Sequence, residues 1–231
     1  WVLRQIAKEK GKSLPAGKAG KKVKGNIILR IHSPEYLFWT AYLTKKLHPE
    51  VPIITHYHLD QTGKLWTIMN RKLLNMADAV IADSEYLKER LMERVGVEEK
   101  LIHVIHCGVD VEVIQPLARS TSHIARRTLL FLGRFIERKR PDFAIEVFAK
   151  LHGKHPNTKL VMIGEGPMLR KLKVKSEELK VAEAIQFTGP LFGEEKLKKY
   201  HESDLFLFPS EKEGFVLVVL EAMAAGLPLL V

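Results

Sequence analysis

The two residues whose types and spacing say most about chemistry are Glu213 and Glu221, near the C-terminal end of the sequence. Seven uncharged residues separate them. If this segment is helical, a rise of 1.5 Å per residue places the two residues about 12 Å apart along the axis. That distance does not suit a catalytic pair acting on one bond. It does suit the two ends of one extended ligand, with the helix N-terminus facing a diphosphate between them.

The surroundings of the two glutamates differ. Glu221 has apolar neighbours on both sides, so we expect it to be at least partly buried and to accept hydrogen bonds from hydroxyl or amide groups. For Glu213, a solvated turn residue is the alternative. Apart from Glu221, residues 215–231 carry no charge. That glutamate, together with Gly226 and Pro228, favours a buried helix and strand over a membrane span.

A second group of candidate residues is basic. Gly133 and Arg134 follow the apolar run at 128–132, and Lys139 comes five residues later. An arginine can bond two phosphate oxygens at once, and a lysine adds a mobile point charge. The sequence therefore indicates a phosphate site beyond this predicted strand, with two solvated surface cations as the alternative.

A glycine pair follows the next predicted strand. Gly164 and Gly166 lie between the apolar run at 159–163 and a predicted helix, where a phosphate or base can approach the backbone closely. Leu169 occupies the third glycine position of the dinucleotide-binding pattern, which argues against NAD. A plain tight turn is the alternative.

The elements that must position these residues alternate regularly. The pattern predicts strands at 26–32, 52–58, 79–82 and 101–105, with helices at 35–48, 65–77 and 85–95. After residues 112–127 it predicts strands at 128–133, 159–163, 184–187, 205–208 and 227–231, with helices at 141–151, 167–179, 194–202 and 214–225. Apolar strands alternating with helices are typical of α/β domains with parallel sheets.

We therefore predict two doubly wound, Rossmann-like domains, both incomplete. A basic, flexible segment at 1–25 precedes the first domain at 26–115, a linker at 116–127 follows, and the second domain is 128–231. Ligands of such folds bind beyond the carboxyl ends of the strands, which points to the cleft between the domains. The chain begins at Trp1 and stops inside an apolar run, so we expect a fragment cut at both ends.

Composition narrows the classes of partner. The net charge is +10, which favours anionic partners such as nucleic acid, lipid or phosphorylated ligands. One cysteine, Cys107, excludes a disulfide scaffold and a cysteine-rich zinc site, and it fits a reducing compartment. The Lys- and Gly-rich residues 8–25 are typical of a solvated loop, with a phosphate- or lipid-binding arm as the alternative.

Several segments together resemble a known family. Residues 210–228 (SEKEGFVLVVLEAMAAGLP) are similar to the signature of the family 4 retaining glycosyltransferases, or glycosyl transferases group 1, which have the GT-B fold. The resemblance extends in order through residues 57–60, 80–84, 104–110, 133–139, 160–167 and 187–189. It covers the chain from about residue 26 to its end.

The resemblance implies a role for each matching residue. Arg134 and Lys139 would neutralise the diphosphate of a nucleotide sugar, Glu221 would hold the ribose hydroxyls, and Glu213 would hold the transferred sugar. His58 would reach that sugar from the first domain. The implied substrate-binding residues also include Gly133, Gly164, Gly166, Phe187, Gly214 and Phe215.

The implied reaction moves a sugar from a nucleotide sugar to an acceptor hydroxyl, with retention at the anomeric carbon. Polysaccharide or glycolipid synthesis is the implied setting. We expect no metal and no other cofactor, because cations and a helix N-terminus can hold the leaving diphosphate and the sequence has no Asp-x-Asp. The expected location is cytoplasmic, with peripheral contact to an anionic membrane through residues 8–25 and the aromatic stretch of Tyr36, Phe38, Trp39 and Tyr42.

Three positions depart from the family pattern. Arg140 replaces a common glycine after the lysine, Val216 replaces the glycine usual after Gly-Phe, and Cys107 replaces a common asparagine. Two alternatives stay open: a nucleotide-sugar epimerase or another GT-B enzyme such as a glycan phosphorylase, and a non-catalytic basic module for nucleotides or nucleic acid. No aromatic platform accompanies the basic residues, which argues against nucleic acid.

Overall fold

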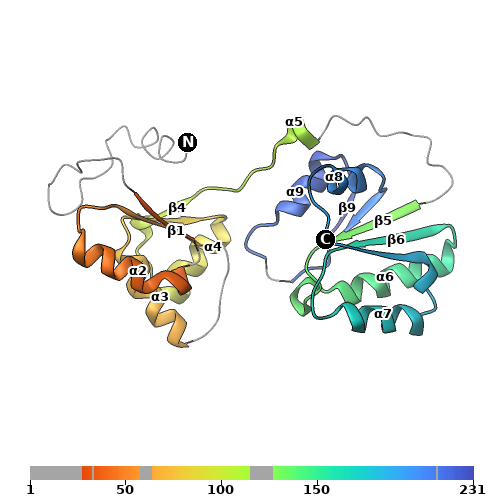
Figure 1. The fold of residues 1–231 in the computed structure, drawn as a ribbon, viewed down its shortest axis with the longest axis horizontal. Helices are drawn as coiled ribbons and strands as arrows, with labels where there is room; N and C mark the ends of the chain where they lie inside the picture. Colours follow the sequence, from red (N-terminus) through yellow and green to blue (C-terminus); the bar gives the residue numbers. More distant parts are fainter. Residues whose placement is uncertain (1–27, 33, 58–63, 115–126, 212) are drawn as a thin grey trace. The chain divides into compact units, whose positions relative to one another are not determined.

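The computed structural model describes residues 28–32, 34–57, 64–114, 127–211 and 213–231. The chain forms two compact units, Trp1–His106 and Cys107–Val231. Each unit is an α/β structure built on one parallel sheet (Figure 1). We describe each unit by itself.

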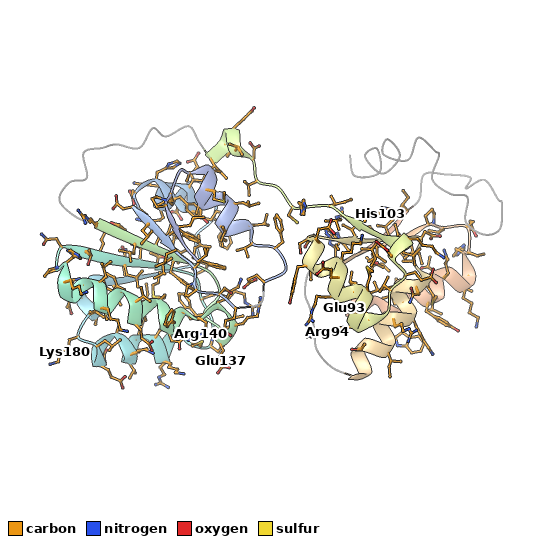
Figure 2. The ribbon with its side chains drawn as sticks, turned by 180° about the vertical axis from the view of Figure 1, so that it is seen from behind. Glu93, Arg94, His103, Glu137, Arg140 and Lys180 are labelled. Atoms are coloured by element: carbon orange, nitrogen blue, oxygen red, sulfur yellow. The ribbon has the colours of Figure 1, made fainter. Side chains whose placement is uncertain are left out.

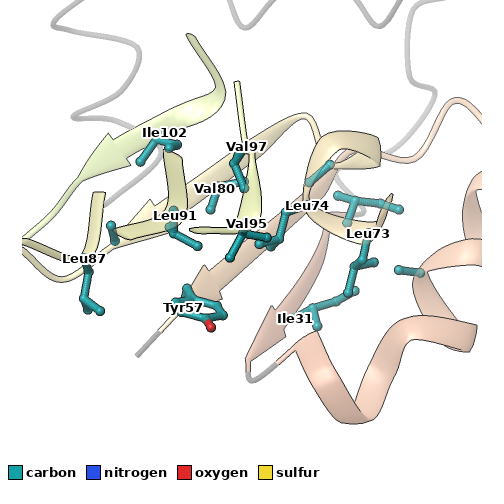
Figure 3. Close-up of a cluster of buried hydrophobic side chains, with 14 residues drawn as sticks. Ile31, Tyr57, Leu73, Leu74, Val80, Leu87, Leu91, Val95, Val97 and Ile102 are labelled. Atoms are coloured by element: carbon teal, nitrogen blue, oxygen red, sulfur yellow. The ribbon is translucent and has the colours of Figure 1, made fainter. Parts of the chain in front are cut away.

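The first unit contains a sheet of four strands in the order β1-β2-β3-β4. The strands are β1 (Leu29–His32), β2 (Ile53–Tyr57), β3 (Ala79–Ala82) and β4 (Ile102–Val104), joined by the helices α2 (Pro34–Leu47), α3 (Lys64–Met76) and α4 (Glu85–Arg90). All neighbouring strands are parallel. Apolar side chains from the strands and from α3 and α4 form the core shown in Figure 3.

The boundaries of α4 show how local sequence places these elements. The Ser84 hydroxyl accepts a hydrogen bond from the backbone N–H of Leu87, 3.2 Å away, and caps the helix start as predicted. The helix continues as a wide π-helical turn at Leu91–Val95. Gly96 ends it in a left-handed conformation, with φ 74°, which glycine adopts without strain.

The second unit contains five parallel strands in the order β7-β6-β5-β8-β9. They are β5 (Arg127–Leu132), β6 (Thr158–Ile163), β7 (Ile185–Gly189), β8 (Leu205–Leu207) and β9 (Leu229–Leu230). Helices α6 (Pro141–Lys154) and α7 (Leu169–Glu178) cover one face, and α8 (Gly193–His201) and α9 (Leu217–Ala224) cover the other (Figure 1). Two separate apolar clusters fill these two layers, so the unit is doubly wound, as predicted.

Strand order locates the point where ligands bind in such folds. From β5 the chain proceeds to β6 and β7 on one side, then returns to β8 and β9 on the other. The strand order therefore reverses at β5, which pairs with β6 on one side and β8 on the other. The loop after β5 leads to α6 on one face of the sheet, and the loop after β8 leads to α9 on the other face. Such switch points are the usual ligand crevices of open α/β sheets.

Two expectations about boundaries differ from the structure. We predicted that the first domain extends to residue 115, but residues from Cys107 onward belong to the second unit. Within it, the short helix α5 (Val111–Ile114) buries Ile114 in the cluster under α8 and α9. The helix predicted at 214–225 begins only at Leu217, because Gly214–Val216 adopt non-helical backbone and no side chain caps the start.

Candidate active site

The loop after β5 carries the predicted phosphate-binding residues. Phe135 is fully buried and anchors the loop in the core, while Arg134 beside it is exposed. A short 3₁₀ turn at Glu137–Lys139 follows, and Arg140 precedes α6 (Figure 2). Pro141 begins α6, where its fixed φ suits the first helical position, as predicted.

Glu213, in the loop after β8, lies against this turn. Lys139 Nζ is 2.7 Å from its Oε1 atom, and Arg138 Nη1 is 2.9 Å from its Oε2 atom. The Ser210 hydroxyl donates a further hydrogen bond to Oε1. The Glu213 side chain is 15% exposed, so the carboxylate is largely enclosed by donors and is not the solvated turn residue of the alternative.

The electrostatic balance at Glu213 favours the ionised form. Burial by itself would raise the pKa of the Glu213 carboxyl. The hydrogen bonds from Lys139 and Ser210 and the charges of Lys139 and Arg138 oppose this and hold the pKa below its ordinary value. Glu213 is therefore a carboxylate at neutral pH, and it can accept hydrogen bonds from hydroxyl groups.

Further contacts join the loops after β5 and β8. The backbone N–H of Glu211 donates to the carbonyl oxygen of Arg138 over 2.9 Å, and Arg140 forms an ion pair with the Glu211 carboxylate. Lys139 Nζ also lies 4.9 Å from the centre of the Phe208 ring, a distance that allows a cation–π attraction. Lys139 and Glu213, predicted to bind phosphate and sugar, are thus brought together at the switch point of the sheet.

The glycine pair after β6 meets the same loop. Gly164 has φ 141° and Gly166 has φ 153°, both in a region that other residues rarely adopt. A Cβ at Gly166 would lie 2.5 Å from the carbonyl oxygen of Phe135, and one at Gly164 would overlap the carbonyl oxygen of Gly133. The backbones of the β5 and β6 loops therefore touch, and the contact requires glycine at both positions.

Glu221 has partners from α8. Lys196 Nζ lies 2.7 Å from Oε1, and the Tyr200 hydroxyl donates to Oε2 over 2.9 Å. The side chain is 16% exposed, which confirms the expected partial burial and the expected hydroxyl partner. Burial and the neighbouring Glu221 carboxylate raise the pKa of Tyr200 far above its ordinary value, so Tyr200 remains a neutral donor.

Glu213 precedes the helix, as the predicted helix at 214–225 implies, but α9 begins at Leu217, four residues after Glu213. The helical rise used to estimate the distance between the glutamates therefore applies only from Leu217 onward. Only Glu221 is on the helix, and Glu213 belongs to the loop. The two carboxylates have separate sets of partners.

The remaining predicted residues are scattered around these loops. Phe187 on β7 is half-buried and packs edge-on against Phe135, with ring centres 6.2 Å apart. Gly214 and Phe215 lie between Glu213 and α9 and are half-buried. His58 lies outside the described residues.

Arg138, Lys196 and Tyr200 are partners of the two glutamates that were not among the predicted site residues, and so is Ser210, which lies within the family signature. Arg138 was next to a predicted residue, but adjacency alone does not show which way a side chain points. The four-residue spacing of Lys196 and Tyr200 on one helical face was the available signal for these two.

Within the described residues, no group of three or more His, Cys, Asp or Glu side chains is arranged to hold a metal ion. None of the described helices combines the length and the apolar character that crossing a membrane requires.

Comparison with known proteins identifies the family. The model for glycosyl transferases group 1 matches residues 118–231, and the model for glycosyltransferase family 4 matches residues 21–113. The chain belongs to the group 1 glycosyltransferases. The resemblance found in the sequence motifs is thereby confirmed for both halves of this glycosyltransferase chain.

Individual relatives agree with the family. Glycogen synthase of Mycobacterium tuberculosis (strain H37Rv) is 29% identical over 210 residues, which cover 86% of this chain and 50% of the relative. D-inositol 3-phosphate glycosyltransferase of Mycobacterium sp. (strain KMS) is 30% identical over 176 residues, which cover 71% and 39%. The glycosyltransferase chain therefore spans half or less of the length of these curated relatives.

Solved structures confirm the predicted GT-B fold. HepE from Anabaena, in complex with UDP-glucose, has a TM-score of 0.74 at 19% identity, covering 87% of this chain and 58% of that one. Sucrose-phosphate synthase from Thermosynechococcus elongatus has a TM-score of 0.73 at 19% identity, covering 99% and 58%. At this identity the likeness concerns the fold alone.

Proposed function

We propose that this glycosyltransferase chain binds a nucleotide sugar through its second unit and transfers the sugar to an acceptor hydroxyl, with retention at the anomeric carbon. The observation that carries the proposal is the meeting of Lys139, Arg138 and Glu213 at the switch point of the second sheet. Family membership and relatives named for sugar transfer support it. The acceptor in this proposal is a glycan or a lipid-linked sugar.

The chemistry assigns a role to each group. The bond between the anomeric carbon and the diphosphate breaks, the oxygen of the acceptor hydroxyl bonds to that carbon, and the hydroxyl proton passes to an oxygen of the departing diphosphate. Arg134 and Lys139 stabilise the negative charge that grows on the departing diphosphate. Glu213 accepts hydrogen bonds from sugar hydroxyls, and Glu221, held by Lys196 and Tyr200, accepts them from the ribose.

The direct test compares nucleotides and then donors. Titration calorimetry with UDP, GDP and ADP should show micromolar to millimolar binding of one nucleotide, weakened about tenfold or more in Glu221→Gln, because a charged acceptor is lost. Product formation with the matching nucleotide sugar then identifies the donor. Binding of none of the three nucleotides would contradict the proposal.

We further propose that the diphosphate is neutralised by side chains and not by a divalent ion. The cations near the end of β5 support this, since Arg134 is exposed and Lys139 lies at the same loop. Turnover should therefore persist in EDTA. Complete loss of turnover in EDTA, restored by manganese or magnesium, would contradict this part of the proposal.

We also propose peripheral contact with the anionic inner face of a membrane through the first unit. Trp39, Tyr42, Leu43 and Lys46 share one face of α2, and all four are exposed. Trp39 and Tyr42 line a groove of about 390 Å³ together with Lys72 and Met76 of α3. Aromatic side chains beside lysines suit the interface of an anionic bilayer.

Vesicle co-sedimentation tests this contact. Binding to anionic but not neutral vesicles, released by salt, is expected because the attraction of surface lysines fades within a Debye length. Trp39→Ala should weaken the binding, whereas the exposed Phe192→Ala in the second unit should leave it unchanged. Equal failure to bind both vesicle types at low salt would exclude the contact.

A further inference from the structure

Glu213 has two cationic partners, which bond different oxygen atoms of its carboxylate. Lys139 reaches Oε1 and Arg138 reaches Oε2. The two cations differ in exposure: the Lys139 side chain is 15% exposed, while that of Arg138 is 35% exposed. The proposed function assigns a role to Lys139 at the diphosphate but gives none to Arg138.

A donor diphosphate changes the charge balance around Glu213. If Lys139 turns toward the phosphate oxygens, Oε1 loses part of its bond, and a new anion stands close to the carboxylate. Like charges at close range disfavour the ionised form of a carboxyl group. Without compensation, Glu213 would take up a proton or turn away, and it would be a poorer acceptor for sugar hydroxyls.

We propose that Arg138 is a positioning residue that keeps Glu213 ionised and in place while Lys139 binds the donor diphosphate. This inference rests on the proposed function. Arg138 suits the task because its own backbone is fixed, since its carbonyl oxygen accepts the backbone N–H of Glu211. Its side chain bonds the oxygen that Lys139 does not use.

The neighbouring arginines are placed differently. Arg140 forms its ion pair with Glu211, and Arg134 is exposed at the start of the loop. Among the described residues, the ion pairs of Glu213 are those with Arg138 and Lys139. Arg138 is therefore the cation that remains with Glu213 when Lys139 is drawn to phosphate.

The first experiment needs no nucleotide. Carbon-detected NMR titration measures the pKa of the Glu213 carboxyl in the unchanged chain, in Arg138→Gln, in Lys139→Gln and in the double variant. The carboxyl signal that disappears in Glu213→Gln is assigned to Glu213. In Lys139→Gln we expect the pKa to stay below its ordinary value, because Arg138 remains. In the double variant the pKa should be clearly higher than in Lys139→Gln, because burial is then opposed by the Ser210 hydrogen bond without either cation. If Lys139→Gln matches the double variant, Arg138 has no such role.

The second experiment uses UDP as the probe in a double-mutant cycle. Arg138→Gln should weaken UDP binding about tenfold when Glu213 is present, because Glu213 then depends on Lys139 alone for its ion pair and withholds it from the diphosphate. In the Glu213→Gln background the weakening should be less than about threefold. Arg138→Lys should recover part of the loss. Equal weakening in both backgrounds would mean that Arg138 attracts phosphate directly and would overturn the inference.

The two experiments separate the inference from the proposed function. If the unchanged chain binds no UDP, a uridine nucleotide as donor is excluded, while the NMR titration still decides whether Arg138 sustains the charge of Glu213. If UDP binds and the titration shows no contribution from Arg138, the proposed function stands and the inference fails.

Discussion

The two units carry charged networks at the same kind of place, the carboxyl edge of a parallel sheet, but the networks differ in kind. In the first unit, Arg30 Nη2 donates to His56 Nδ1 over 3.0 Å, so the other ring nitrogen carries the proton and donates to Asp83 Oδ1 over 2.6 Å. His56 is 7% exposed and Asp83 is 3% exposed. Both ring nitrogens of His56 thus have a partner in the chain, and although Arg30 is exposed, we call this network closed because its histidine and its carboxylate are buried and paired with each other.

In the second unit the corresponding network is open. Arg138, Lys139 and Arg140 face the two carboxylates of Glu213 and Glu211, and Arg134 adds an exposed positive charge. Arg140 Nε also lies 3.9 Å from Asp142 Oδ1, so these residues comprise four cations and three acids, and an anionic ligand would complete the balance. A charged cluster at a sheet edge therefore indicates a ligand site when its charges are unequal and accessible. Burial and internal pairing indicate a structural role instead.

The largest effect on the free energy of unfolding is expected where the loops after β5 and β6 touch, next to the open network. Gly164→Ala should lower the free energy of unfolding of the second unit by more than about 3 kcal/mol, because its Cβ would overlap the Gly133 carbonyl and the residue has φ 141°. Urea unfolding measures the change.

Gly153→Ala is the matched control for this substitution. Gly153 is exposed within α6 and a Cβ there meets no atom within 4 Å, so the substitution should stabilise the unit by about 0.5–1 kcal/mol. Similar effects of the two substitutions would show that the β5 and β6 loops are not in contact.

The second largest effect on the free energy of unfolding is expected in the closed network of the first unit. Asp83→Asn should lower the free energy of unfolding of the first unit by about 2–3 kcal/mol, because a buried charged partner of His56 is lost. Nucleotide binding by the second unit should not change. The control Glu50→Gln, at an exposed pair with His48, should stay within about 0.5 kcal/mol. A negligible effect of Asp83→Asn would remove the distinction between closed and open networks.

A smaller effect is expected at the partners of Glu221. Tyr200→Phe removes the hydroxyl that bonds Oε2 but keeps the ring, and it should destabilise the second unit by about 1 kcal/mol. Nucleotide affinity should fall as well, since Lys196 is then the one partner that orients the Glu221 carboxylate among the described residues. Tyr86→Phe, at a ring that is 43% exposed, serves as the control and should leave both quantities unchanged. If both variants behave alike, Tyr200 does not orient Glu221.

The smallest expected effect is on the pH dependence of the free energy of unfolding. The pKa of Glu213 is lower in the folded chain than its ordinary value of 4.5, so its ionised form stabilises the fold above that value. This contribution is lost as the pH falls through the lowered pKa. Urea unfolding between pH 3 and 7 should therefore show a shallower acid decline in Glu213→Gln than in the unchanged chain. An identical decline in both would contradict the ion pairing.

The sequence predicted the architecture because its signals were local. Apolar runs of strand length, Ser84 as a cap, Gly96 as a helix end and Pro141 as a helix start each depend on a few adjacent residues, and the elements appear where these signals lie. The start of α9 was predicted too early, because residues 214–216 are apolar like the helix that follows. Only backbone geometry distinguishes them.

The partners within the site were less accessible to prediction. Glu213 bonds Arg138, which is 75 residues earlier in the chain, and Glu221 bonds Lys196 and Tyr200 on another helix. Such pairs follow from the order of strands and the facing of helices, which no short motif encodes. The predicted roles of the site residues stay predictions, and that of His58 lies outside the described residues.

Arg140 has a consequence for how this site varies among related chains. Its backbone is left-handed, with φ 49°, a conformation that glycine adopts at no cost and arginine does not. The ion pair with Glu211 compensates by tying two loops together. A related chain with glycine at position 140 does not need this ion pair. We therefore expect positions 140 and 211 to covary, with an acidic residue at 211 where 140 is arginine and varied residues at 211 where 140 is glycine.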